Sequence, residues 1–464
     1  MREISVREII SAIGGECISG DPETIVTGIS TDSRTINPGM VFFALKGERF
    51  DGHDFLENVI ASGCSAVVVS KEIGVLLSFA QNKGVAVIKI TDTLIGLQDL
   101  AAYYLSQFDI IKIAVTGSTG KTTTKEMLYH ILSEKYNAVR NLGNFNNLIG
   151  LPLSVFNIDN DTEVAVFEMG MDRLGEIHRM AEIIKPNLAV ITNIGLSHIE
   201  RLGNRKNILK AKMEIVDFFN RENILVINWD NDMLSSATYK GEYRFVTVGK
   251  TEKANFQIVE VQDFGQDGIK FTLNNENEVK EFCLSTPGIH NAQNASLAVA
   301  AAMCFDISME EAKKGLAKLT DSDKRLHIMQ RQGITIIDDT YNASPDSMRA
   351  AIDVLVSISG GRKIAILGDM FELGQKEEEY HFQIGEYASH KGVDVIISVG
   401  KNAKYISEGA RTGGTKAIHF EKKDFLQKVL NQWIRPKDIV LVKGSRGMAM
   451  DEVVMQLENN GSQE

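Results

Sequence analysis

Short apolar runs alternate with longer amphipathic segments along almost the whole chain. The apolar runs suit strands that are buried on both faces of a sheet, and the segments between them have the length and periodicity of crossover helices. This alternation is typical of parallel sheets covered by helices. The hydrophobic pattern therefore predicts an α/β fold.

Changes in this pattern divide the chain into three predicted α/β domains, at residues 1–108, 109–318 and 319–464. A length of 464 residues is too great for one ordinary core and fits about three domains. In the first domain the pattern predicts strands at residues 25–30, 41–45, 66–69 and 85–90, and a helix within 91–108 that leads into the second domain.

The second predicted domain opens with the strand IIKIAVTG and continues with strands at residues 164–167, 188–194 and 224–228. Residues 243–284 alternate more and contain more turn residues, which predicts a small antiparallel addition before the helix at 291–305. The third domain follows a doubly wound, Rossmann-like pattern, with strands predicted at residues 334–338, 363–367, 393–399 and 438–442.

Composition excludes several classes of protein. A formal net charge of -11 argues against a nucleic-acid binder, although a few local cations could still hold an anionic small molecule. The charged N-terminus is unlike a signal peptide, and no apolar run is long enough to span a membrane. The four cysteines are scattered, so we expect neither disulfides nor a structural zinc site. These features favour a cytoplasmic protein.

A glycine-rich loop, TGSTGKTT at residues 116–123, follows an apolar strand and precedes a helix. Such a loop directs backbone N–H groups and a helix N-terminus at phosphate oxygens. Lys121 can then reach the β- and γ-phosphates of ATP, and the Thr122 hydroxyl suits Mg²⁺. The alternative is a glycine-rich turn with a chance lysine. The expected ATP contacts are Thr116, Gly117, Ser118, Thr119, Gly120, Lys121, Thr122 and Thr123.

Two further polar residues follow predicted strands of the same sheet. Glu168 comes after the run VAVF, and His198 comes shortly after LAVITNI. Ligands bind beyond the carboxyl ends of parallel strands, and a carboxylate and an imidazole beside a phosphate loop suit a divalent cation. Alternatively, Glu168 could begin a helix and His198 could be an ordinary loop histidine.

Lys212 lies in the middle of a predicted apolar helical stripe that includes Ile208, Ile215 and Phe219. A buried lysine is costly unless it is paired, reaches back to solvent along its aliphatic stem, or is chemically modified. The residues leave all three possibilities open.

The loop departs from the common phosphate-loop pattern, because Val115 stands where that pattern has glycine. The shorter string T-G-x-x-G-K-T at residues 116–122 resembles that of the Mur ligase and folylpolyglutamate synthetase superfamily. Recognisable stretches run from residue 30 to residue 445. The resemblance implies an ATP-dependent amide ligase that uses an acyl phosphate and two Mg²⁺ ions. It also implies that Lys212, in the string AKMEI, is carbamylated and helps to hold the second ion, so that Lys121, Glu168, His198 and Lys212 are the expected catalytic residues.

The resemblance assigns roles to residues in all three domains. His290, Asn291 and Asn294 are expected to contact adenine, although Asn291 could also cap a helix. Arg325 and Asp339 are expected to handle the nucleotide, and Arg325 could instead be a surface charge. The expected substrate contacts are Ser30, Asp32, Ser33 and Arg34 for uridine diphosphate, Asn146 and Asn147 for positioning, and Tyr341 and Asn342 near the reacting groups.

Three strings favour one amine substrate within this family. DDTYNASPDSM, ILGDMFELG and GSRGMAMDEVV resemble those of members that add D-alanyl-D-alanine to UDP-N-acetylmuramoyl-tripeptide. The D-Y-A-H-T-P and D-N-P-R strings of members that add the third amino acid are absent, and residues 30–55 count against a folylpolyglutamate ligase. Those two activities remain alternatives, as does a nucleotide-dependent switch. The expected partners are small molecules, and we expect a monomer.

Overall fold

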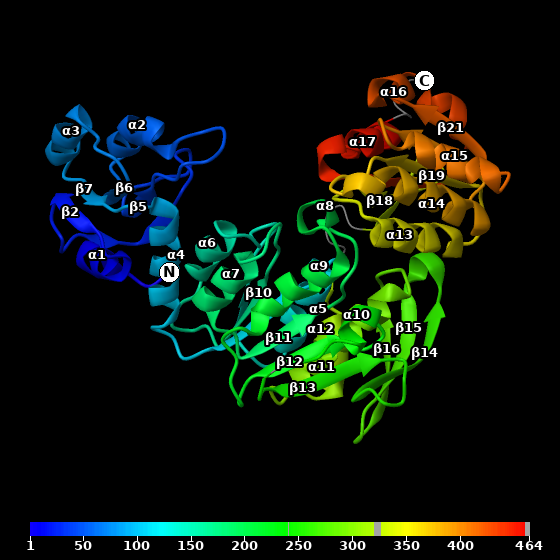
Figure 1. The fold of residues 1–464 in the computed structure, drawn as a ribbon, viewed down its shortest axis with the longest axis horizontal. Helices are drawn as coiled ribbons and strands as arrows, with labels where there is room; N and C mark the ends of the chain where they lie inside the picture. The colour runs from blue at the N-terminus through cyan, green and yellow to red at the C-terminus, as the bar shows by residue number, and fades with distance from the viewer. Residues whose placement is uncertain (240, 320–325, 460–464) are drawn as a thin grey trace.

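The computed structural model describes residues 1–239, 241–319 and 326–459. Figure 1 shows three lobes in chain order, with the N-terminal lobe in blue and the C-terminal lobe in orange and red on either side of a central lobe. Each lobe is built on its own sheet, of five, nine and six strands respectively. This arrangement confirms the predicted α/β fold with three domains, whereas the residue bounds of the domains stay a prediction.

The N-terminal lobe contains a five-stranded sheet with the order β2-β7-β6-β5-β4. Strands β4 to β7 are parallel and β2 is antiparallel to β7. Helices α1 and α4 pack on one face of the sheet, and α2 and α3 on the other. The elements are β1 (Ile4–Ser5), α1 (Val6–Ile13), β2 (Glu16–Ser19), β3 (Ile25–Val26), β4 (Gly28–Ser30), β5 (Met40–Phe43), η1 (Gly52–Phe55), α2 (Leu56–Ala61), β6 (Ala66–Val69), α3 (Val75–Lys83), β7 (Ala86–Lys89) and α4 (Thr93–Leu105).

Helix α4 joins the first two lobes through a shared core. The carboxylate of Asp92 caps its first turn by accepting hydrogen bonds from the backbone of Leu94 and Ile95. The fully buried Tyr104 donates a hydrogen bond of 2.7 Å from its hydroxyl to the carbonyl of Ile158 in the central lobe. Because apolar residues of both lobes surround α4, it is a structural junction and not a flexible linker.

The central sheet has the strand order β16-β15-β14-β13-β12-β11-β8-β10-β9. Strands β8 to β14 are parallel, and β14, β15 and β16 form an antiparallel extension. The prediction that residues 243–284 are wholly antiparallel is therefore wrong for β13, which extends the parallel sheet. The strands are β8 (Ile111–Thr116), β9 (Ala138–Arg140), β10 (Val164–Glu168), β11 (Leu188–Ile191), β12 (Ile224–Asn228), β13 (Arg244–Gly249), β14 (Phe256–Asp263), β15 (Ile269–Asn274) and β16 (Val279–Leu284).

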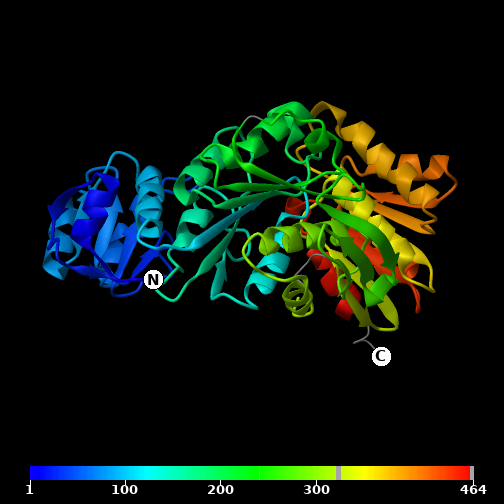
Figure 2. The same ribbon diagram turned by 90° about the horizontal axis from the view of Figure 1, so that it is seen from below.

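Helices cover both faces of this sheet, which explains why its central strands are almost wholly apolar (Figure 2). One face packs against α5, α11 and α12, and the other against α6, α7 and α9. The helical segments are α5 (Lys121–Leu132), α6 (Gly150–Val155), α7 (Glu176–Ile184), α8 (Ile199–Leu202), α9 (Arg205–Met213), η2 (Glu214–Val216), α10 (Asp232–Ser235), η3 (Gly265–Asp267), α11 (His290–Met303) and α12 (Met309–Leu316). No helix in the described ranges is both long and apolar enough to cross a membrane.

The C-terminal sheet has the order β17-β18-β22-β19-β20-β21, in which β17 alone is antiparallel to its neighbour. Helices α13, α14 and α15 cover one face, and α16 and α17 the other. The elements are β17 (His327–Arg331), β18 (Ile334–Asp339), α13 (Pro345–Ser357), β19 (Lys363–Gly368), η4 (Gly374–Lys376), α14 (Glu377–His390), β20 (Val395–Val399), α15 (Lys404–Thr412), β21 (Lys416–Phe420), α16 (Lys423–Trp433), β22 (Ile439–Lys443), η5 (Arg446–Met448) and α17 (Asp451–Asn459). The last strand thus lies between the first two parallel strands.

Candidate active site

A pocket of about 780 Å³ lies where the central and C-terminal lobes meet. It is formed by the carboxyl ends of β8 and β10, the segment after β11, and the first turns of α11 and α13. Its lining includes these predicted site residues: Ser118, Thr119, Gly120, Lys121, Thr123, Asn146, Asn147, Glu168, His198, His290, Asn291, Asn294, Asp339, Tyr341 and Asn342. A volume of this size suits a nucleotide and its co-substrates.

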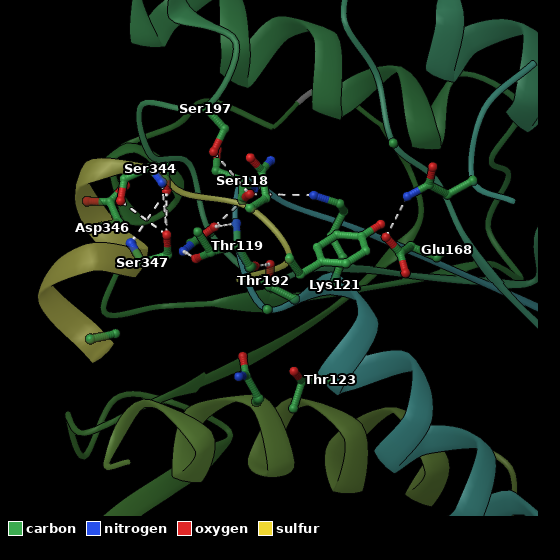
Figure 3. A pocket seen from close by; sticks show the side chains of 18 of the residues that line it. Ser118, Thr119, Lys121, Thr123, Glu168, Thr192, Ser197, Ser344, Asp346 and Ser347 are labelled. Carbon is green, nitrogen blue, oxygen red and sulfur yellow. Dashed lines mark hydrogen bonds between the residues drawn. The ribbon is translucent and has the colours of Figure 1, made fainter. Parts of the chain in front are cut away.

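The glycine-rich loop connects β8 to α5 at the floor of this pocket, as the strand–loop–helix pattern predicts. Gly120 has a φ of +78°, and a Cβ there would lie 2.5 Å from the side-chain oxygen of Asn294, so both backbone and space require glycine. The Lys121 ammonium donates to the carbonyls of Gly117, at 2.9 Å, and Ser118, at 3.4 Å (Figure 3). The lysine therefore lies folded over its own loop.

Thr122 and Glu168 are in direct contact behind the loop. The Thr122 hydroxyl donates to one Glu168 oxygen at 2.6 Å, and the Asn146 amide donates to the other at 2.7 Å. Glu168 is the last residue of β10 and is 1% exposed, so the alternative that it begins a helix is wrong. The arrangement places a hydroxyl and a carboxylate, both suitable for a hard divalent cation, beside the phosphate loop.

Lys212 is buried, with 1% of its surface exposed, so the alternative that its side chain reaches solvent is wrong. It has no hydrogen-bond or ion-pair partner within the described ranges. Burial, and secondarily the charge of Lys121, holds the pKa of the Lys212 amine well below its usual value. The side chain is thus held towards its neutral form, which is the form of an amine that reacts with carbon dioxide to give a carbamate.

His198 lies just before α8 and turns towards the C-terminal lobe. Its Nδ1 atom is 2.7 Å from a carboxylate oxygen of Glu372 and 3.1 Å from one of Asp172. Arg201 also reaches both carboxylates, and the contact with His198 is the main cause of the lowered pKa of Glu372. The ligand atoms of Asp172, His198 and Glu372 lie within 4.8 Å of one another, so that among the described residues these three side chains could hold a metal ion. The sequence reasoning missed Asp172 and Glu372, although each follows a buried strand.

The residues expected at the adenine gather at the start of α11. The Asn291 side chain donates to the carbonyl of Pro287 at 2.7 Å and accepts a hydrogen bond from Asn294 at 3.0 Å. The helix begins at His290, so the alternative that Asn291 is its N-cap is wrong. These amides order the helix start next to Gly120 of the phosphate loop, and their contact with adenine stays a prediction.

In the C-terminal lobe, Asp339 ends β18 and pairs with Lys443 at the end of β22. The Lys443 ammonium lies 2.5 Å from an Asp339 carboxylate oxygen and 2.9 Å from the carbonyl of Asn342. Tyr341 and Asn342 follow in the pocket lining, whereas Arg325 lies outside the described residues. The sequence reasoning missed Lys443, whose one signal was its place at the end of the predicted strand 438–442.

The residues predicted for uridine diphosphate lie apart from this pocket, at the carboxyl end of β4 in the N-terminal lobe. Ser30 is buried and its hydroxyl accepts a hydrogen bond from the Asp32 backbone at 3.0 Å. Arg34 donates to both carboxylate oxygens of Asp32, which lowers the pKa of that carboxyl to about 2. Ser33, between Asp32 and Arg34 in the sequence, is partly exposed. The turn is thus ordered and polar, and its ligand stays a prediction.

Comparison with known proteins decides the family. Three family models match the chain: "Mur ligase family, catalytic domain" over residues 25–104, "Mur ligase middle domain" over 115–302 and "Mur ligase, glutamate ligase domain" over 324–446. The UDP-N-acetylmuramoyl-tripeptide--D-alanyl-D-alanine ligase of Bacillus subtilis is 39% identical, over 98% of each chain. The chain belongs to the Mur ligase family.

Other relatives are similar to this Mur ligase over all or nearly all of its length. The ligase of the same name from Escherichia coli is 34% identical over 100% of both chains. A crystal structure of MurF from Acinetobacter baumannii superposes with a TM-score of 0.89 at 31% identity over 99% of each chain. That of MurF from Thermotoga maritima, in complex with ADP, gives a TM-score of 0.81 at 27% identity over 93% of this chain and 97% of the other.

One residue that the sequence reasoning missed braces the phosphate loop of this Mur ligase. The side-chain oxygen of Asn193 accepts hydrogen bonds from the backbone of Ser118, at 3.0 Å, and of Thr119, at 2.9 Å. Its amide nitrogen donates to the Thr119 hydroxyl at 2.6 Å, and the neighbouring Thr192 donates to the Thr119 carbonyl. The segment after β11 therefore holds the first half of the loop, which leaves the amides around Lys121 to face a phosphate.

We expect Asn193→Ala to raise the KM for ATP about 30-fold, because three hydrogen bonds that shape the loop are lost. The kcat should fall less, because Lys121 is retained. Asn223→Ala is the matched control, since Asn223 lies before β12, at the opposite end of the sheet, and also bonds backbone carbonyls. Steady-state kinetics would check this. A KM for ATP that stays within twofold of the wild type would contradict the bracing role.

Proposed function

We propose that this Mur ligase joins D-alanyl-D-alanine to UDP-N-acetylmuramoyl-tripeptide, with conversion of ATP to ADP and phosphate. Full-length similarity to relatives that carry this activity in their names is the observation that supports it most strongly. The phosphate loop at the junction of two lobes is consistent with a reaction in which one lobe holds ATP and another presents a co-substrate.

In the first step the γ-phosphate passes to the terminal carboxylate of the tripeptide and gives an acyl phosphate. Such transfer depends on positioning and on neutralising charge more than on covalent help from the protein. The Lys121 ammonium, now hydrogen bonded to loop carbonyls, would turn to the phosphate oxygens together with the amides at the start of α5.

In the second step the amine of the dipeptide attacks the activated carbonyl, a tetrahedral intermediate forms and phosphate leaves. Water would compete with the amine, so the reactants must be enclosed. The pocket is lined from both the central lobe, by Ser118 and Lys121, and the C-terminal lobe, by Tyr341 and Ser344, so that movement of one lobe against the other would close it.

The donor set fits Mg²⁺, because a hydroxyl and a buried carboxylate already touch beside the phosphate loop. Thr122 and Glu168 would hold one ion, and a carbamylated Lys212 together with His198 would hold the second. When bound, Mg²⁺ would offset the negative charge of the phosphates. The lowered pKa of Lys212 supports carbamylation, since burial shifts the amine towards the neutral form that reacts with carbon dioxide.

Amine specificity tests the proposal. Purified enzyme with ATP, Mg²⁺ and UDP-N-acetylmuramoyl-tripeptide should release phosphate at least about tenfold faster when D-alanyl-D-alanine is present. The mass of the uridine nucleotide should increase to that of the pentapeptide in step with phosphate. Turnover supported only by glutamate or a single amino acid would retain the ATP site and rule out the dipeptide ligase.

A further inference from the structure

The turn that follows β22 lies at the carboxyl edge of the C-terminal sheet. This strand is the last in the chain but lies between β18 and β19, and the helix that follows it, α17, lies on the opposite face of the sheet from α13 and α14, which follow those two neighbours. Such switches of strand order form the crevices in which open α/β sheets bind ligands. Residues Gly444 to Met448 therefore occupy a favoured place for a ligand that the C-terminal lobe presents to the pocket.

Two cations lie at this strand end, and the structure uses them differently. Lys443 is buried and held by the Asp339 carboxylate and the Asn342 carbonyl. Arg446 is exposed, and its guanidinium lies over the ring of Tyr341, 5.8 Å from the ring centroid. Within the described ranges Arg446 has no carboxylate partner, and its exposed guanidinium lies beside Tyr341, which lines the pocket.

Carboxylates close to this turn are held by other groups. Asp369 accepts hydrogen bonds from the backbone of Asn402, at 3.0 Å, and of Ala403, at 2.6 Å. Glu372 contacts His198. Among the described residues no carboxylate pairs with Arg446, which leaves its guanidinium available for a carboxylate from outside the chain.

Two aromatic rings, Tyr341 and Phe371, lie at this turn. Phe371 is 44% exposed, and its backbone N–H donates to the Ser445 hydroxyl at 2.8 Å, which fixes its loop against the turn. Gly447 lies against this ring, since a Cβ there would come within 3.0 Å of it. The turn therefore carries a carboxylate-binding fork at Arg446, over the Tyr341 ring, and an apolar ring against the next residue, Gly447.

We propose that Arg446 binds the C-terminal carboxylate of the incoming D-alanyl-D-alanine. The proposal rests on the function proposed above and adds the residue that selects a free dipeptide acid. Arginine binds carboxylates through two parallel hydrogen bonds, and the exposed rings suit the methyl groups of alanine. An extended dipeptide spans about 7 Å. Because Arg446 lies over Tyr341, which lines the pocket, the amine of a dipeptide held at Arg446 would reach towards the pocket.

The test compares D-alanyl-D-alanine with its C-terminal amide, which has the same shape but no negative charge. Wild type should prefer the acid by about 100-fold in kcat/KM, the range of a charged bidentate contact. Arg446→Met should lower kcat/KM for the acid by about the same factor, mainly through KM, and leave the amide and the KM for ATP unchanged. Arg446→Lys, which keeps charge without the fork, should fall between.

Arg411→Met is the matched control, because Arg411 is another exposed arginine of this lobe whose guanidinium donates to a carbonyl of β21. It should retain the wild-type preference for the acid. An Arg446→Met enzyme that also keeps this preference, or that loses acid and amide turnover equally, would overturn the assignment. A wild-type enzyme with no turnover on the dipeptide at all would instead overturn the proposed function.

Discussion

Replacing Lys121 by alanine is expected to lower kcat for ligation about 10³-fold, the scale seen when a charge-stabilising group is removed from phosphoryl transfer. Lys121 begins α5 at the floor of the pocket, and its ammonium is held by two carbonyls of the loop. A triphosphate would attract the ammonium more strongly than these neutral carbonyls do. The side chain can therefore move to the γ-phosphate and neutralise the charge that develops on it. Dipeptide-dependent phosphate release measures the loss.

Two further measurements separate catalysis from folding in this experiment. Lys135→Ala is the matched control, since Lys135 follows the same helix, bonds the carbonyl of Asp306 outside the pocket and should retain full activity. Thermal unfolding of Lys121→Ala should match that of the wild type, because Lys121 is only partly buried. Activity within tenfold of wild type in a folded Lys121→Ala enzyme would remove Lys121 from the phosphate site.

Replacing Lys212 by methionine is expected to lower kcat about 10²-fold and at the same time to stabilise the unliganded protein. Methionine has a similar length and no charge, so it removes the cost of burying an amine at a site that is 1% exposed. The loss of kcat measures the contribution of the Lys212 amine to catalysis. The gain in stability measures the cost of burying that amine. Equal activity of the variant at limiting Mg²⁺ would rule out a role for Lys212 in the metal site.

The pH dependence of this stabilisation follows from the lowered pKa of Lys212. Between the folded pKa and the unfolded value of 10.5 the unfolded chain binds more protons, so the free energy of unfolding of the wild type rises with pH. The advantage of Lys212→Met is therefore largest at low pH, about 1.4 kcal/mol for each unit by which the pKa is lowered, and shrinks as pH approaches 10.5.

Denaturant unfolding in buffer free of Mg²⁺ and carbon dioxide, which keeps the lysine unmodified, would measure this difference. The difference in the free energy of unfolding between wild type and variant should become smaller as the pH rises from about 7 to about 9.5. A difference that is constant across this interval would mean that burial does not lower the pKa of Lys212 in the folded protein.

The strands buried on both faces were predictable because their apolar runs are local signals. Strands β6, β8, β10 and β12 match their predicted ranges within about a residue. Edge strands β17 and β21 were missed, since they are partly exposed and their residues do not form apolar runs. The parallel direction of β13 could not be predicted, because a strand carries no local mark of how its neighbour runs.

Some contacts of the candidate site were likewise predictable from the sequence, and others were not. The contact of Thr122 with Glu168 follows from two neighbouring parallel strands, whose carboxyl ends must meet at one edge. The contact of His198 with Glu372 joins residues far apart in the chain and depends on how two separate sheets are placed. Nothing in either local sequence records that placement, and so Glu372, Lys443 and Asn193 were absent from the predicted site.

The sequence by itself determined the α/β class, the phosphate loop and the family, because each depends on the order of residues within short segments. Only the tertiary structure decided that Lys212 is buried and not extended to solvent, that Asn193 braces the loop, and that the guanidinium of Arg446 lies over the ring of Tyr341. Burial and pairing depend on what packs against a side chain, and those neighbours come from distant parts of the chain that meet only in the folded protein.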